Sequence, residues 1–506
     1  MLKSDYSHLD SGRSTPIPQD APPSVHSISS ARKQARAQAK QRMFHTINYE
    51  PRLSHFDPHS DYRDFRGFFI LFWISLSIMV MTTVLRNIKD TGYPLRVQMW
   101  KLLSANVIQL GISDFAMVFS TGLSLPLQRL YRSSKGPLQW RNGGIWIQSF
   151  FQAIWLAIWV EWPFMLRWTW TAQVYFALHT LTFLMKMHSY AFYNGHLGEA
   201  ERRLRALDEP ETASLERAVR YPSSPSRLQE IDADEMLDGA LEQKEQLAQL
   251  RQDLATELTS PLGHVTYPQN LTLWNYCDYV LCPTLCYELE YPRTPRIRWL
   301  ELFWKALAVF GCIFLLTLIS DEFIVPVLDE SAVRLQHSWT VSDKALILAE
   351  TISMLLFPFM ITFLLVFLVI WEYLLGAFAE ITCFADRHFY SDWWNSSDWL
   401  EFSKEWNIPV HHFLRRHVYF SSRTYFSNST AMFITFLVSS LGHELIMGCI
   451  TKKLRGYGFV AMMSQLPIVA VQRSKLVRGR WVFNNAVFWI SMVLGLSMMC
   501  ALYVLV

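Results

Sequence analysis

The chain has 506 residues, of which 51% are hydrophobic and 15% aromatic, and its formal net charge is only +3. The apolar residues stand in long blocks, which excludes an ordinary soluble chain divided into several domains. No nucleic acid is expected as a partner.

Residues 1–66 are predicted to be a mostly disordered arm in the cytosol. The arm is polar, is rich in Ser, Pro, Gln and His, and carries the basic segment "ARKQARAQAKQR" at 31–42. Such a composition buries too little apolar surface to fold by itself. Positive charge before a first membrane span favours a cytosolic N-terminus.

Long apolar blocks with few charges recur along the rest of the chain. A transmembrane helix needs about 20 mainly apolar residues, and this criterion predicts about nine spans. The predicted spans are residues 67–85, 106–125, 145–162, 171–192, 302–319, 345–381, 431–450, 458–472 and 485–506. The eighth is short, and the sixth is long enough to tilt or to kink at Pro358.

Counting spans from a cytosolic N-terminus assigns a side to each polar segment. Segments 194–297, 383–426 and 473–484 fall in the cytosol, and the acidic loop 321–343 falls in the lumen. The basic loop 86–101 disagrees, because the count places it on the luminal side.

The chain is thus divided into four regions. They are the arm (1–66), a first group of spans (67–193), a charged cytosolic linker with a pre-span segment (194–297) and a membrane core (298–506) that holds the FYSDWWN segment and a His in mid-span. The linker is expected to be solvated, although a sparse apolar stripe leaves open a helix packed on its neighbours. Cys277, Cys282 and Cys286 lack the spacing of a zinc site, so no metal is expected.

His443 and Glu444 lie in the middle of the predicted span "MFITFLVSSLGHELIMGCI". Ionisable groups at membrane depth are costly and mark functional sites. Three classes of protein use such a pair: a lipid acyltransferase with His as general base, an ion-coupled or lipid transporter, and a scaffold in which the pair only packs. A transporter favours repeated halves, which the sequence lacks.

Four segments bear on this choice. They are "YPRTPRIRW" (291–299), "FYSDWWN" (389–395), "EWNIPVHHFLRRHVY" (405–419) and "SSLGHE" (439–444). Together they resemble the sterol and diacylglycerol acyltransferases of the membrane-bound O-acyltransferase (MBOAT) family, and the C-terminal run most resembles fungal sterol enzymes. The resemblance implies an all-α polytopic membrane protein of the endoplasmic reticulum, a homodimer or homotetramer, with a cytosolic interfacial amphipathic helix.

The resemblance also implies the reaction. A long-chain acyl group would pass from acyl-CoA, a substrate rather than a cofactor, to a sterol hydroxyl and form a steryl ester. Diacylglycerol is the alternative acceptor. The family's catalytic His falls on His443 and its Asn on Asn407. A buried neutral imidazole suits a general base, and an amide can donate to the thioester oxygen.

The other site residues follow from the same segments. Substrate-binding residues are expected to be Trp406, His411, Ser439 and Glu444, and the motif residues are Phe389, Tyr390, Asp392, Trp393, Trp394 and Asn395. On one helix, Trp393, Trp394, Trp399, Phe402 and Trp406 would form an apolar face lying in the membrane interface. His411, His412, Arg415, Arg416 and His417 would form a basic patch for the polyanionic coenzyme A. Gly442 and Gly448 are expected to leave room for the sterol rings.

Overall fold

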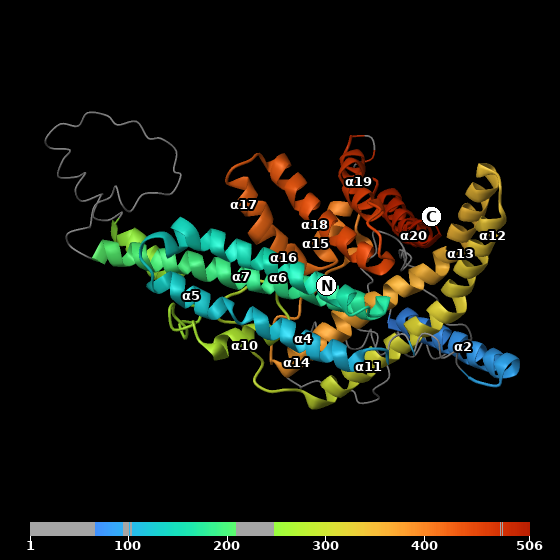
Figure 1. Cartoon of the computed structure of the whole chain (residues 1–506), viewed down its shortest axis with the longest axis horizontal. Helices are drawn as coiled ribbons and strands as arrows, with labels where there is room; N and C mark the ends of the chain where they lie inside the picture. The colour runs from blue at the N-terminus through green and yellow to red at the C-terminus, as the bar shows by residue number, and fades with distance from the viewer. Residues whose placement is uncertain are drawn as a thin grey trace, which may run out of the picture. The chain divides into compact units, whose positions relative to one another are not determined.

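A computed structural model describes residues 66–94, 101, 104–208, 247–475, 477 and 479–505 (Figure 1). By its contacts the chain divides into two units, Met1–Leu76 and Ser77–Val506. Of the first unit, the structure describes only the start of helix α2 (Arg66–Thr91), so the predicted disordered arm lies outside the described residues apart from Arg66. The features below belong to the second unit unless they concern α2.

The regular structure of the described residues is helical, and the β pairing consists of the isolated bridges Thr259–Thr266 and Arg293–Phe384. After α2 come α4 (Val107–Thr121), α5 (Ser124–Ser133), α6 (Ile145–Met165), α7 (Trp170–Asp208), α10 (Leu273–Leu281), α11 (Trp299–Ile319), α12 (Val325–His337), α13 (Val341–Phe367), α14 (Leu375–Ile381), α15 (Trp399–Glu405), α16 (Ile408–Phe413), α17 (Phe420–Arg423), α18 (Asn428–Thr451), α19 (Tyr457–Gln472) and α20 (Trp481–Leu505). The 3₁₀ turns are η1 (Gly136–Leu138) and η5 (Trp393–Asn395), and the π turns are η2 (Trp140–Gly144), η3 (Ser320–Ile324), η4 (Leu368–Leu374) and η6 (Leu414–Tyr419). The all-α fold is confirmed.

Among the described residues, 7 helices are long and apolar enough to cross a membrane. They cover Phe69–Thr91, Val107–Ser133, Trp140–Met165, Trp299–His337, Val341–Ile381, Asn428–Thr451 and Trp481–Leu505. The two remaining predicted spans also lie on helices. One corresponds to α19, which has only 16 residues, and the other lies in α7, whose apolar half carries His179, Lys186 and His188. The predicted count of nine is therefore not confirmed.

The predicted luminal loop at 321–343 is mostly helix, which corrects the sequence-based boundary. α11 continues through the π turn η3 into α12. The acidic residues of this segment do not stop the helix. One of them, Glu322, accepts a hydrogen bond from the Asn87 side chain at 2.8 Å. The break comes only before α13, where the hydroxyl of Thr340 accepts a hydrogen bond from the Asp343 amide at 3.0 Å.

The predicted boundary at 193/194 coincides with no break in the helix, because α7 runs through it to Asp208. Gly195 suits this position, since an added Cβ would lie 2.1 Å from Trp140.

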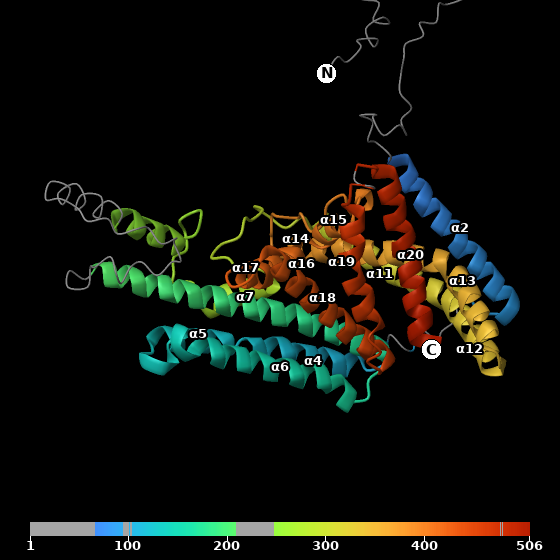
Figure 2. The ribbon, with the colours of Figure 1, turned by 90° about the horizontal axis from the view of Figure 1, so that it is seen from above.

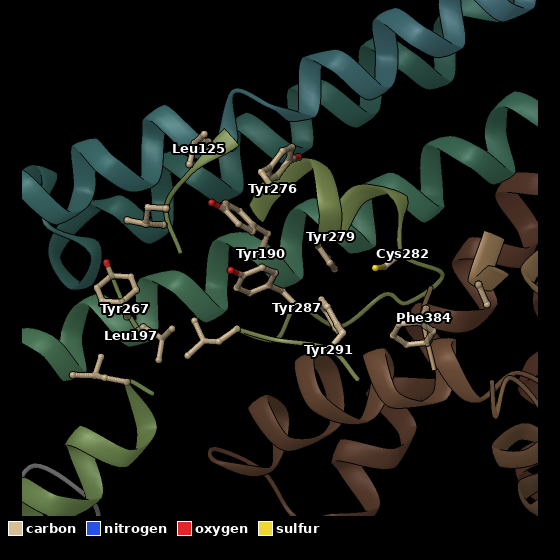
Figure 3. Close-up of a cluster of buried hydrophobic side chains, with 14 of the residues drawn as sticks. Leu125, Tyr190, Leu197, Tyr267, Tyr276, Tyr279, Cys282, Tyr287, Tyr291 and Phe384 are labelled. Carbon is tan, nitrogen blue, oxygen red and sulfur yellow. The ribbon is translucent and has the colours of Figure 1, made fainter. Parts of the chain in front are cut away.

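The described residues after 247 are packed rather than solvated. Leu254 and Leu258 are buried in the same cluster as the tyrosines of Figure 3, which come from α7, from α10 and from the segments before and after α10. The packed-helix alternative is therefore the one observed.

The helix that carries His443 is held from several sides. α18 packs against α7, α19 and the π turn η6, and Figure 2 shows it beside α7 and α19. α13 in turn packs against α20. The segment between α14 and α18, which contains two of the four motifs, is thus bounded by membrane-crossing helices on both sides in sequence.

Candidate active site

The chain just before Asn407 is fixed by aromatic packing. The Trp406 ring stacks on Phe363 with centroids 4.5 Å apart and planes 9° apart, and the Trp371 ring is also 4.5 Å away. Trp393 meets the same ring edge-on at 4.8 Å. Such aromatic pairs stabilise beyond their buried area, so Trp406 is a packing anchor.

Asn407 begins helix α16. Its side-chain oxygen accepts a hydrogen bond from the Val410 amide at 3.1 Å, and Pro409 occupies the first turn, where its missing N–H is no loss. The Asn407 Nδ2 group makes no hydrogen bond to any residue that the structure describes. Because the cap fixes the oxygen, two N–H donors remain for another group.

The FYSDWWN segment is hydrogen-bonded to the residues on either side of Trp406 and Asn407. Ile408 N donates to Phe389 O at 3.1 Å, and Ser391 N donates to Glu405 O at 2.9 Å, so the two motifs are joined through their backbones. From α20, the side chain of Asn485 donates to Trp394 O at 3.0 Å. The Tyr390 hydroxyl donates to Glu372 at 2.9 Å. Phe389 and Trp393 are buried, and Asp392 and Asn395 are exposed at the turn. The motif therefore positions Trp406 and Asn407.

The predicted amphipathic helix over 393–406 is not continuous. The 3₁₀ turn η5 ends at Asn395, and α15 begins only at Trp399, where Asp398 caps it by accepting a hydrogen bond from Glu401 N at 2.8 Å. The sequence Asn-Ser-Ser-Asp explains the break, because these side chains favour turns and helix caps. Trp393 and Trp399 point into the protein core, so they do not form an interfacial face.

His443 presents one ring nitrogen. Its Nδ1 lies 2.8 Å from the Ser439 carbonyl, one helical turn earlier. A carbonyl oxygen only accepts, so Nδ1 carries the proton and Nε2 of the neutral ring has a free lone pair. The side chain is exposed, contrary to the buried imidazole expected from sequence. Ser440 is buried, and its hydroxyl donates to Phe436 O at 2.7 Å.

The Glu444 carboxylate is held by hydrogen bonds from other helices. Its carboxylate accepts hydrogen bonds from Gly456 N at 2.7 Å, Phe459 N at 3.0 Å and the Tyr503 hydroxyl at 2.8 Å. These partners lie at the start of α19 and the end of α20. Through these bonds Glu444 ties three helices together, and its substrate-binding role stays a prediction.

Replacing Glu444 with alanine is expected to destabilise the protein. Two part-buried backbone N–H groups and the buried Tyr503 hydroxyl would lose their acceptor, at up to about 1–3 kcal/mol for each group left unsatisfied. Thermal unfolding of the purified variant should show a clear fall in Tm. A Tm equal to that of the native chain would show that the carboxylate does not hold α19.

The expected basic patch is smaller than predicted. Burial lowers the pKa of His411 to about 4 and that of His417 to about 3, so both rings are neutral near pH 7. Burial also lowers the pKa of His412. Arg416 donates to Glu288 at 2.7 Å, which neutralises its charge locally. Arg415 is exposed, with its guanidinium 5.3 Å from the Phe420 ring.

The lowered pKa of His417 predicts a loss of stability in acid. Below its ordinary pKa of 6.5 the unfolded chain binds a proton that the folded chain does not bind until about pH 3. The contribution of the neutral His417 ring to the free energy of unfolding is thus fully present above pH 6.5 and decreases progressively as the pH drops toward 3. His417→Gln, which can keep the 2.9 Å bond to the Ser189 hydroxyl, should lose less Tm between about pH 7 and about pH 5. An unchanged pH dependence in this variant would contradict the assignment.

The structure relates His443 and Asn407 through η6. This π turn follows α16, which Asn407 begins, and packs against α18, which carries His443. No hydrogen bond joins the two side chains within the described part of the chain. π turns are frequent at functional sites. Nothing in the sequence pattern distinguished this turn from a regular helix, and the Ser439 carbonyl that orients the imidazole was likewise missed, although its i−4 spacing was available as a signal.

The chain matches a known protein family. Residues 145–505 match the model of the membrane-bound O-acyltransferase family. The chain belongs to this family and is an acyltransferase that crosses a membrane several times.

Several individual relatives within this family are named sterol O-acyltransferase. The chain is 39% identical over 447 residues to "Probable sterol O-acyltransferase 2" of Schizosaccharomyces pombe, with 87% of each chain covered. It is 33% identical over 473 residues to "Sterol O-acyltransferase 2" of Candida albicans, covering 87% of this chain and 75% of that one. A similarity of 35% to "Diacylglycerol O-acyltransferase 1" of Dictyostelium discoideum extends over only 244 residues, 48% of this chain and 38% of the relative. The predicted sterol O-acyltransferase resemblance is confirmed.

Proposed function

We propose that this protein transfers a long-chain fatty acyl group from acyl-CoA to the hydroxyl of a sterol, with His443 as general base. The observation that carries the proposal is the hydrogen bond from Nδ1 to Ser439 O, because it leaves the Nε2 lone pair available. The sterol, as opposed to diacylglycerol, is supported by relatives named sterol O-acyltransferase that align over most of the chain.

The reaction needs a base and an oxyanion donor. Nε2 of His443 takes the proton from the sterol hydroxyl as its oxygen attacks the thioester carbon. The negative charge then develops on the thioester oxygen, where the uncommitted Nδ2 group of Asn407 can donate. Collapse breaks the carbon–sulfur bond and expels the CoA thiolate, which takes the proton from His443 Nε2 and so regenerates the neutral base. No covalent acyl-enzyme and no metal or cofactor is required by this sequence of steps.

Three residues would assist this chemistry. Trp406 holds Asn407 in place through its aromatic contacts. Ser439, one turn before His443, orients the imidazole through its carbonyl, and its hydroxyl is proposed to contact the thioester or the pantetheine arm. His411, neutral near pH 7, would bind coenzyme A as a hydrogen-bonding group rather than by charge. We further propose an endoplasmic reticulum location, a cytosolic N-terminus and a homodimer or homotetramer.

The acceptor is tested directly with purified protein and oleoyl-CoA, supplied with a sterol or with diacylglycerol. We expect steryl ester as the main product. Triacylglycerol as the main product would move the chain to the diacylglycerol reaction, and the absence of both products would contradict the proposed acyl-CoA-dependent reaction with either acceptor.

Gly442→Leu is expected to impair the use of a bulky acceptor. A Cβ at Gly442 would meet nothing within 4 Å, so the leucine adds bulk beside His443 without a clash inside the protein. A Cβ at Gly448 would lie 2.5 Å from Leu454, so that glycine serves packing and does not provide the space predicted for the sterol. Steryl ester formation should fall more than acyl-CoA binding. An undiminished rate of ester formation would show that the acceptor does not approach along this face.

A further inference from the structure

A separate polar cavity of about 430 Å³ lies where the end of α19, the start of α20 and the turn before α15 meet. It is lined by Ser397, Asp398, Gln472, Arg473, Gly479 and Asn484. None of these residues has a part in the proposed reaction. The volume is within the range of small-molecule sites, roughly 300–1,000 Å³.

Two buried amides line this cavity with polar atoms that lack partners. Gln472 and Asn484 are each 5% exposed. Within the described chain, Gln472 Nε2, Gln472 Oε1 and Asn484 Oδ1 have no hydrogen-bond partner. The Asn484 amide is fixed by its other end, because Nδ2 donates to Val477 O at 3.3 Å. Buried polar groups are normally paired, so the cavity offers one donor group and two acceptors to a ligand.

The charged residues that line the cavity are paired with each other. Arg473 donates to Asp398 through Nε at 2.8 Å and Nη2 at 3.2 Å, and Asp398 also caps α15. The ligand is therefore selected by hydrogen bonds at the amides. It must bring an acceptor for Gln472 Nε2 and N–H or O–H donors for the two amide oxygens.

The position of the cavity indicates where such a ligand comes from. α20 is long and apolar enough to cross a membrane, and Asn484 lies in its first turn. The cavity thus lies at one end of a helix that is long and apolar enough to cross a membrane, where lipid headgroups are expected. The exposed side chains of Lys475 and Arg480 lie in the segment between α19 and α20. Basic groups at this depth attract lipid phosphates.

We propose that this cavity binds the headgroup of a phospholipid that carries an N–H or O–H donor beside its phosphate. A phosphate oxygen accepts from Gln472 Nε2, and the amine or hydroxyl donates to Gln472 Oε1 and Asn484 Oδ1. Phosphatidylethanolamine meets both requirements. Phosphatidylcholine has the phosphate but no donor, so it leaves the two amide oxygens unpaired.

The test is the retention of lipid by the full-length protein, measured by native mass spectrometry after exposure to phosphatidylethanolamine or phosphatidylcholine. Leaving buried acceptors unpaired is costly, and we expect on the order of tenfold better retention of phosphatidylethanolamine. Gln472→Glu keeps the shape but places a carboxylate against the phosphate, and Gln472→Leu removes both polar atoms. Both variants should lose the preference.

Gln465→Leu is the matched control, because Gln465 is on the same helix but does not line the cavity, and it should keep the preference. Equal retention of the two lipids, or a preference that survives in both Gln472 variants, would overturn the proposal. Displacement of phosphatidylethanolamine by inorganic phosphate alone would show a free-anion site and would also overturn it. Asn484→Leu provides a second variant if Gln472→Leu does not fold.

Discussion

Replacing His443 with alanine is expected to abolish ester formation while the protein remains folded. The imidazole is exposed, and among the described residues its hydrogen-bond partner is the Ser439 carbonyl of its own helix, so its loss leaves no buried partner there unsatisfied. General base catalysis contributes about 10²–10⁴-fold, and the rate should fall by at least this order. The measurement is steryl ester formation from oleoyl-CoA, normalised to folded protein.

Leu441→Ala serves as the control for this variant. Leu441 is an exposed residue on the same helix, 56% exposed, so its truncation tests for general damage to α18. We expect near-normal activity in the control and unchanged acyl-CoA binding in both variants. Substantial turnover by a folded His443→Ala protein would show that another group takes the proton.

Asn407 should separate into a structural and a chemical contribution. Asn407→Ala removes the cap of α16, which costs about 1 kcal/mol of stability, and also removes the Nδ2 donor. Asn407→Asp keeps an oxygen that accepts from Val410 N but has no N–H. Losing one oxyanion donor costs about 10²–10³ in rate, so both variants should be nearly inactive, and only the alanine variant should be less stable.

Thr340→Ala is the control for the loss of a helix cap. Thr340 caps α13 through the Asp343 amide and has no place in the proposed chemistry, so this variant should lose some stability and keep its activity per folded molecule. A fully active Asn407→Asp protein would show that the cap oxygen is the only required part of Asn407. The oxyanion role would then be wrong.

The apolar blocks of the sequence predicted the membrane helices well, because length and hydrophobicity decide membrane insertion. They could not predict the continuation of α11 into α12, since charged residues such as Asp321 are compatible with a helix and a boundary depends on contacts made elsewhere. The same limit applies to α7. Glycine is a poor helix former, and Gly195 lies within this helix where it contacts Trp140, a residue distant in the sequence.

The candidate site was partly accessible from sequence. The motifs indicated His443 and Asn407, and the spacing of His443 and Ser439 allowed the i−4 contact that orients the ring. The structural contacts of Glu444 and Trp393 were missed for one reason. Amphipathic patterns show which side chains are apolar or charged, but Glu444 found its partners at α19 and α20, and Trp393 found its partners in the core. Such long-range partners are not encoded in local spacing.

The central claim, that His443 drives acyl transfer to a sterol, is tested most directly by giving radiolabelled oleoyl-CoA and a sterol to the purified native chain and to His443→Ala in parallel. The account predicts labelled steryl ester from the native chain and none above background from the variant, with equal binding of acyl-CoA to both. Equal ester formation by the two proteins, or no ester from the native chain, would contradict it.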